Sequence, residues 1–125
     1  MTHLFLVALG GAIGSVLRYL VGLGTLRSFG PAFPWGTLTV NITGSFLIGF
    51  ISEAIMQKFG GSPEMRVFLI TGILGGYTTF SSFSLDAIAL LERGETMPAM
   101  LYVGSSVILS GLAVVAGLAL MRAMV

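Results

Sequence analysis

The fold is decided by the stretch Thr71-Gly72-Ile73-Leu74-Gly75-Gly76-Tyr77-Thr78-Thr79-Phe80-Ser81-Ser82-Phe83-Ser84, which lies within the third of four long apolar segments. Adjacent glycines and β-branched threonines are poor helix formers, so we expect a membrane-crossing helix that is broken around Gly75–Thr79. A break at membrane depth frees backbone N–H and C=O groups, and each unsatisfied group in lipid costs several kcal/mol. Protein, water or an ion must therefore complete those groups. The alternative is a continuous Gly/Thr-rich helix packed against its neighbours.

The four apolar segments are each close to the ~20 residues that cross a bilayer. They cover about residues 4–26, 35–54, 67–91 and 98–121. The connections between them are short and polar, which favours antiparallel neighbouring helices. We therefore expect an all-α membrane protein with four transmembrane helices, the third of them broken mid-membrane, in a single domain that spans residues 1–125.

The composition indicates a lipid environment and excludes several kinds of protein. The chain is 55% hydrophobic and 9% charged, with a mean hydropathy of +1.00, whereas a soluble domain carries roughly 25% charged residues. A net charge of +1 gives no indication of a nucleic-acid partner. The absence of cysteine excludes disulfides, thiolate metal sites and a Cys nucleophile. We find no nucleophile with a base, no metal-ligand cluster and no phosphate loop, so we do not expect an enzyme.

Basic residues are divided evenly between the two ends of the expected bundle. The three at one end are Lys58, Arg66 and Arg122, and the three at or nearer the other end are Arg18, Arg27 and Arg93. Three against three gives the positive-inside rule almost no preferred orientation. Such a chain could insert both ways, and two inverted copies could then form an antiparallel, dual-topology homodimer. The alternative is a single orientation that another factor determines.

Polar side chains within the spans are candidate functional residues, because such groups are costly at membrane depth and are often functional. Asn41 is the only asparagine, and its amide can donate two hydrogen bonds to an anion. Tyr102, Ser106 and Ser110 recur every four residues, which gives a row of hydroxyl donors on one helix face. Such a row could replace the water around a strongly hydrated anion. In each case the alternative is a polar contact that only packs the helices together.

Two further features fit ion binding near the break. Phe80 and Phe83 share a helix face, and the positive edges of their rings could line a path for an anion, although ordinary packing is the commoner role. Carbonyls freed between Gly75 and Thr78 would suit a small hard cation such as Na⁺. In an antiparallel dimer, both copies could supply them. Arg18 could draw anions into a vestibule, or it could pair with a carboxylate.

These motifs resemble the Fluc (CrcB) family of bacterial fluoride channels over nearly the whole chain. The segments that carry the resemblance are Gly14-Ser15-Val16-Leu17-Arg18-Tyr19, Gly36-Thr37-Leu38-Thr39-Val40-Asn41 with Gly44-Ser45-Phe46, and Gly75-Gly76-Tyr77-Thr78-Thr79-Phe80-Ser81-Ser82-Phe83. The last motif is quite specific. Ser82 stands where threonine is frequent in the family and Asp86 where glutamate is frequent, and both keep the chemical class.

The resemblance implies a dual-topology homodimer in the bacterial inner membrane, with two antiparallel pores through which fluoride leaves the cell passively. It implies a structural Na⁺ at the dimer centre, held by main-chain oxygens of Gly75 and Thr78. It implies that Phe80 and Phe83 lie beside each pore and that Arg18 lies in a vestibule. The positions that match the polar fluoride path are Asn41, Ser81, Ser82, Tyr102, Ser106 and Ser110.

Two other functions stay open at this stage. A small proton-coupled multidrug exporter also has four short spans and dual topology, but it normally needs a carboxylate in the first span, and residues 4–26 contain neither Asp nor Glu. A non-transporting assembly subunit would use its glycines for helix packing and leave the polar side chains unused.

Overall fold

The structure is a computed structural model that describes residues 1–125, and all of its regular elements are helices. Four helical segments are long and apolar enough to cross a membrane. Three of them are single helices: α1 (Thr2–Phe29), α2 (Trp35–Lys58) and α6 (Thr96–Met124). The third segment in chain order is divided into α3 (Pro63–Met65), η1 (Arg66–Leu74), α4 (Gly75–Tyr77) and α5 (Phe80–Glu92). The predicted all-α architecture, with four spans and an interrupted third, is confirmed.

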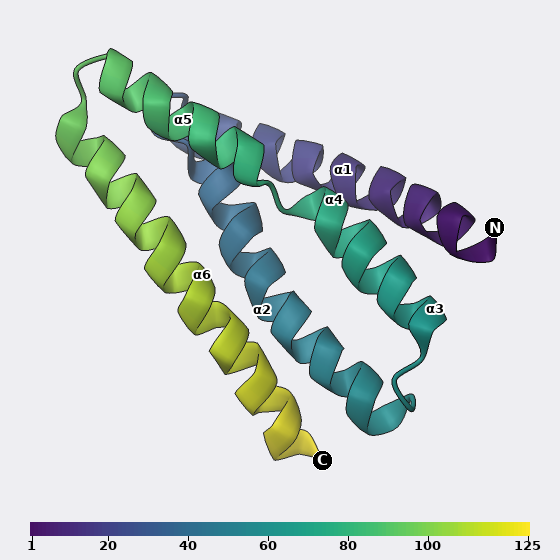
Figure 1. Ribbon diagram of the computed structural model, residues 1–125. Helices are drawn as coiled ribbons and strands as arrows, with labels where there is room; N and C mark the ends of the chain where they lie inside the picture. The colour runs from purple at the N-terminus through teal and green to yellow at the C-terminus, as the bar shows by residue number, and fades with distance from the viewer.

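Glycines allow the helices to pack with their backbones in contact. Helix α6 runs alongside α2, and α1 runs alongside η1 and α4 (Figure 1). A Cβ at Gly117 of α6 would overlap the Phe46 carbonyl of α2. A Cβ at Gly10 of α1 would lie 2.6 Å from the Phe68 carbonyl oxygen of η1. Both helix pairs therefore depend on positions that carry no side chain.

The third span leaves helical geometry at its threonines and not at its glycines. Thr78 and Thr79 are extended, with φ/ψ of −88°/159° and −154°/121°. Gly75 and Gly76 belong to the helical turn α4, so the break is shorter than the predicted Gly75–Thr79 interval. The reason is packing, because a Cβ at Gly76 would lie 2.7 Å from the Gly11 carbonyl oxygen of α1. The low helix propensity of glycine is outweighed here by close contact between helices.

A π-helix, η1, leads into the break, and the sequence did not predict it. At its end the Gly75 N–H reaches the carbonyl of Ile70, five residues earlier, as well as that of Gly72. π-Helical turns are rare and are frequent at functional sites. The backbone is therefore already widened before the chain becomes extended at Thr78.

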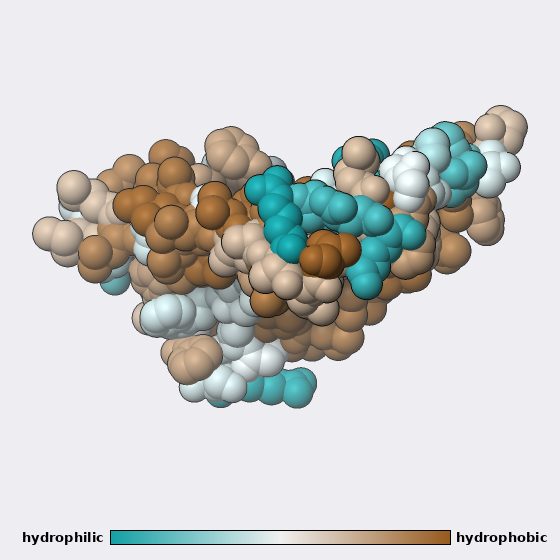
Figure 2. Space-filling view, turned by 90° about the horizontal axis from the view of Figure 1, so that it is seen from below, coloured by the Kyte–Doolittle hydropathy of each residue, from teal (hydrophilic) through white to brown (hydrophobic).

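Most of the exterior is apolar. Only 16 of the 125 residues are buried, which leaves Phe5, Val107 and Leu112 among the many large apolar side chains that are more than half exposed. Figure 2 shows this from one end of the molecule, where hydrophilic groups form limited patches between apolar areas. A chain with so little of its apolar surface covered is suited to lipid and to a further protein surface.

Candidate functional site

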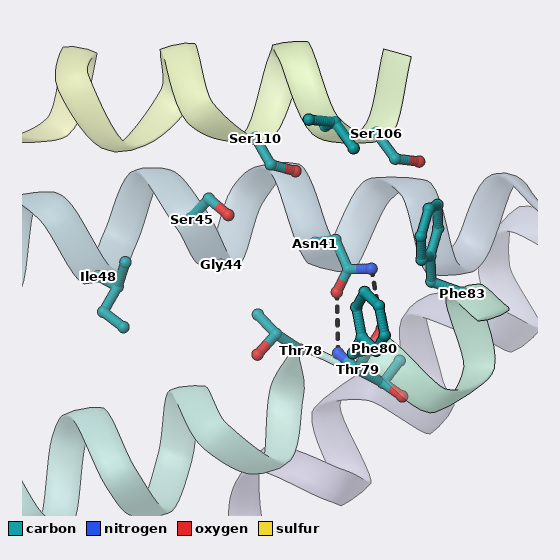
Figure 3. Close-up of a pocket in the computed structure, with 11 residues that line it drawn as sticks. Asn41, Gly44, Ser45, Ile48, Thr78, Thr79, Phe80, Phe83, Ser106 and Ser110 are labelled. Carbon is teal, nitrogen blue, oxygen red and sulfur yellow. Dashed lines mark hydrogen bonds between the residues drawn. The ribbon is translucent and has the colours of Figure 1, made fainter. Parts of the chain in front are cut away.

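A cavity of about 320 Å³ lies where α2, α5 and α6 meet the break (Figure 3). We call it the Asn41 cavity. Its lining residues are Asn41, Gly44, Ser45, Ile48, Thr78, Thr79, Phe80, Phe83, Ser106, Val107 and Ser110. The cavity brings together five residues that the sequence singled out for an anion path: Asn41, Phe80, Phe83, Ser106 and Ser110.

The Asn41 side chain pairs with the peptide groups of Thr79 in both directions. Its Nδ2 donates to the Thr79 carbonyl at 3.0 Å, and the Thr79 N–H donates to Oδ1 at 2.8 Å (Figure 3). The amide therefore completes two backbone groups that the break would leave unpaired, as buried backbone groups require. One of its two N–H donors stays free for a ligand, whereas both were expected to be available from the sequence.

Two serine hydroxyls of α6 have no partner within the protein. Ser106 is 6% exposed, and the Oγ atoms of Ser106 and Ser110 are both buried without a hydrogen bond. Both residues line the Asn41 cavity, and Figure 3 shows their hydroxyl groups on the side of α6 that faces it. A buried hydroxyl without a partner costs about 1–3 kcal/mol, so these groups favour a polar occupant of the cavity.

Tyr102, the third member of the predicted row, does not line the Asn41 cavity. It is fully buried, and its ring packs against Phe33 and Phe83 at centroid distances of 5.5 Å and 5.3 Å. Its hydroxyl donates to the carboxylate of Asp86 at 3.1 Å. The row therefore supplies two unpaired hydroxyls and one that is already bonded.

The two phenylalanines differ in their surroundings. Their ring centroids are 5.6 Å apart, in a tilted arrangement. Phe83 packs against the core around Tyr102, whereas the Phe80 side chain is 79% exposed. Phe80 therefore forms a wall of the cavity on a side that this protomer leaves open.

A second cavity, of about 210 Å³, lies on the other side of the break. We call it the Arg18 cavity, and its polar lining includes Arg18, Thr25, Thr37, Thr79, Ser82 and Asp86. The Arg18 Nε donates to the carbonyl of Gly76 at 3.0 Å, so this arginine also supports the end of α4. Thr79 lines both cavities, which places the start of α5 between them.

Ser81 lines neither cavity. It is an exposed residue, and its hydroxyl lies 3.3 Å from the Thr79 hydroxyl. The same Thr79 oxygen accepts a hydrogen bond from the Ser82 N–H at 3.1 Å, as expected of an N-cap threonine. Ser81 and Ser82 thus lie on different sides of the start of α5, and only Ser82 lines a cavity.

The backbone at the break has carbonyl oxygens of the kind that bind a hard cation. In a continuous α-helix, the N–H groups of Thr79 and Ser82 would bond to the carbonyls of Gly75 and Thr78. Here those N–H groups bond to Asn41 and to the Thr79 hydroxyl instead. Main-chain oxygens suit Na⁺, and the chain has no group of His, Asp or Glu side chains that would hold another metal. The residues present therefore fit the cation that the resemblance implies.

A family model described as "CrcB-like protein, Camphor Resistance (CrcB)" matches residues 5–118. The chain belongs to the CrcB family. The match extends over all four spans, so the break and both cavities fall inside it. The family membership expected from the motifs at Gly14–Tyr19, Gly36–Phe46 and Gly75–Phe83 is confirmed.

Similar CrcB-family proteins extend over the same length. A protein of Rhizobium meliloti (strain 1021), named fluoride-specific ion channel FluC, is 74% identical over 125 residues, which is 100% of both chains. Proteins with the same name from Rhizobium etli (strain CIAT 652) and Agrobacterium fabrum (strain C58 / ATCC 33970) are 61% and 58% identical. They cover 99% and 98% of each chain. These relatives therefore match this chain over nearly their whole length, and they are named as ion channels.

Two contacts near the break in the third span were not predicted from the sequence. Thr79 was treated only as a helix breaker, although a threonine directly before a helix that starts at Phe80 is a typical N-cap. Thr43 of α2 lies with its hydroxyl 2.9 Å from that of Tyr77, and no sequence pattern indicated this pair. The Thr79 hydroxyl caps the start of α5, and the Thr43–Tyr77 pair links α2 to α4.

Proposed function

We propose that this chain is a fluoride channel that lets fluoride leave a bacterial cell passively and so lowers cytoplasmic fluoride. The observation that carries the proposal is the pair of buried, unpartnered hydroxyls of Ser106 and Ser110 in the Asn41 cavity. The names of full-length relatives that are 58–74% identical support the same function.

The path follows from the two cavities. An anion is attracted into the Arg18 cavity by the guanidinium and meets the Ser82 hydroxyl there. It passes the start of α5 at Thr79 into the Asn41 cavity. There Ser106, Ser110 and the free N–H of Asn41 replace water as hydrogen-bond donors.

Fluoride can leave the path only if its contacts in the two cavities are weak when taken together. Phe80 and Phe83 offer positive ring edges without a fixed charge. The Asp86 carboxylate in the Arg18 cavity offsets part of the arginine charge, so an anion is not held there. Ser81 joins the path only where a further surface covers the exposed start of α5. A small, strongly hydrated anion gains most from closely placed donors, which favours fluoride over chloride.

We also propose that the working unit is an antiparallel homodimer of two inverted copies in the inner membrane. Phe80 is 79% exposed beside the Asn41 cavity, which a second copy would cover. The even division of basic residues between the two ends supports insertion in both orientations.

The chain has no cysteine, so Ser28→Cys gives a single label site at the end of α1. In intact cells, an impermeant thiol reagent should label about half of the protein. Complete labelling or complete protection would contradict dual topology.

The proposed dimer also holds a structural Na⁺ at its centre. Each copy would contribute the Gly75 and Thr78 carbonyls, whose usual N–H partners are bonded elsewhere. When bound, the ion supplies positive charge to oxygens that lipid cannot solvate. Exchange of Na⁺ for N-methylglucamine on both sides of the membrane should slowly reduce fluoride efflux from liposomes.

The function is tested by fluoride efflux from liposomes that contain the purified chain. A fluoride electrode should report rapid release when charge is balanced by an ionophore, while protein-free liposomes retain their fluoride. Proton-driven movement of a lipophilic cation without fluoride efflux would favour the exporter. No transport of either kind would favour the assembly subunit.

A further inference from the structure

We infer that Asn41 and Thr79 are positioning residues for the cation site, because they divert the N–H groups that would otherwise occupy the Gly75 and Thr78 carbonyls. The inference rests on the proposed Na⁺ and adds to it the side chains that keep its ligands free. It also gives Asn41 a role on the cation side of the break, in addition to its place beside the anion path.

Asn41 acts on the Gly75 carbonyl through Thr79. In an α-helix, the carbonyl of residue 75 bonds to the N–H of residue 79. The Thr79 N–H lies 2.8 Å from Asn41 Oδ1, and Asn41 Nδ2 holds the Thr79 carbonyl at 3.0 Å. Both bonds keep the Thr79 peptide turned toward α2. The Gly75 carbonyl is thereby left without its helical donor.

Close packing keeps Asn41 in reach of the break. Gly44 lies one turn after Asn41 on α2, and a Cβ there would overlap the Thr78 side chain. The threonine therefore approaches the α2 backbone more closely than any other residue at position 44 would permit. This approach holds the extended residues at hydrogen-bonding distance from the asparagine amide.

Thr79 acts on the Thr78 carbonyl in the same way. The helical partner of that carbonyl would be the Ser82 N–H, which donates to Thr79 Oγ1 at 3.1 Å. The Thr79 side chain thus caps α5 and releases the oxygen of the preceding residue. One side chain from a different helix and one from the break itself leave the two expected ligands free.

The carbonyl of Gly76, which lies in the sequence between the two expected ligands, has a side-chain hydrogen-bond donor. It accepts a hydrogen bond from Arg18 Nε at 3.0 Å. It is therefore already bonded, whereas the carbonyls of Gly75 and Thr78 lack the donors that a helix would supply. Side chains from α1, α2 and the break together decide which oxygens face a cation.

The test measures Na⁺ binding by thermal unfolding of the purified full-length chain in detergent. NaCl replaces N-methylglucamine chloride at constant ionic strength, and the readout is the Na⁺ concentration that gives half of the maximal stabilisation. We expect this concentration to rise about tenfold or more in Asn41→Leu and in Thr79→Val, which remove the acceptors that hold these N–H groups away from the carbonyls.

Two matched variants separate positioning from other roles. Thr79→Ser keeps the hydroxyl acceptor, so its Na⁺ response should stay within about threefold of the parent. Ser110→Ala removes a donor of the proposed fluoride path that makes no hydrogen bond to the break. It should slow fluoride efflux and leave the Na⁺ response unchanged.

Each outcome decides a different point. An undiminished Na⁺ response in Asn41→Leu and Thr79→Val would overturn the inference and leave the Na⁺ site standing. No Na⁺ response in the parent would overturn the site and the inference together, while fluoride efflux still tests the channel separately. If both variants fail to fold, hydrogen exchange of residues 74–82 in the parent and in Thr79→Ser decides. Protection of the Thr79 and Ser82 N–H groups in the absence of Na⁺ supports the inference, since side chains then hold them without the ion, and free exchange of these groups overturns it.

Discussion

The hydroxyl of Tyr102 donates a hydrogen bond to the carboxylate of Asp86, with 3.1 Å between Oη and Oδ2. This bond separates Tyr102 from the two serines that follow it on the same face of α6. Ser106 and Ser110 have buried hydroxyls with no partner, whereas the tyrosine donor is used. A row of residues that looks uniform in the sequence therefore contains two buried hydroxyls without a partner and one that is bonded to Asp86.

The serines should matter more for transport than the tyrosine hydroxyl. We expect Ser106→Ala and Ser110→Ala each to slow fluoride efflux about tenfold, since a hydrogen bond to an anion is worth ~1.5–3 kcal/mol. Tyr102→Phe keeps the ring packing and should slow efflux less than about threefold. Ser105→Ala is the control, because its hydroxyl bonds only to the Tyr102 carbonyl. A Tyr102→Phe channel slower than both serine variants would show that the hydroxyl contacts the anion.

Arg18 should stabilise the end of α4 in addition to attracting anions. Arg18→Lys keeps the charge but loses the Nε donor to the Gly76 carbonyl, so we expect a loss of about 1–3 kcal/mol in the free energy of unfolding. Arg27→Lys is the matched control, since Arg27 is an exposed residue of the same helix. Chemical unfolding in mixed micelles measures both. Equal stability of the two variants would mean that the contact with Gly76 contributes nothing.

The two phenylalanines should respond differently to the same substitution. Phe80→Ile removes a ring that is 79% exposed in the protomer, so we expect slower fluoride efflux with little change in protomer stability. Phe83→Ile also removes packing on Tyr102, which should lower the free energy of unfolding by about 0.5–1.5 kcal/mol beyond the loss of area. Phe5→Ile on the exposed face of α1 is the control. Parent-like efflux in both variants would exclude a role for the ring edges.

Two glycines of α6 test the close approach of α2 and α6. Gly117→Ala places a Cβ against the Phe46 carbonyl, and we expect it to lower the free energy of unfolding by about 1–3 kcal/mol. Gly111→Ala meets no atom within 4 Å, so it should be neutral or stabilise by up to about 1 kcal/mol. Thermal unfolding in detergent distinguishes them. If the two substitutions had the same effect, the helices would not be in backbone contact at Gly117.

The sequence predicted the number of spans and the interruption of the third, because both follow from composition and local propensity. The predicted interval, Gly75–Thr79, contains the break but is wider than the two extended residues, Thr78 and Thr79. Both glycines belong to the helical turn α4, and Gly76 packs against the α1 backbone at Gly11, a contact that helix propensity does not report. The π-helix η1 has no local sequence signal that we recognise.

The sequence predicted which residues line the candidate site better than it predicted their hydrogen bonds. Asn41, Ser106 and Ser110 were singled out as polar residues at membrane depth, and they do line one cavity. The pairing of Asn41 with Thr79 joins residues 38 positions apart and depends on how α2 packs against the break. The partner of Tyr102 was missed for the same reason, because Asp86 lies on a different helix.

Fluoride conduction through the Asn41 cavity is tested most directly by fluoride efflux from liposomes. The parent should release trapped fluoride rapidly once an ionophore balances charge, and Ser106→Ala together with Ser110→Ala should slow the release strongly at equal protein content. Release no faster than from protein-free liposomes would contradict the account. Parent-like release in the double variant would leave a fluoride channel whose path lies outside this cavity.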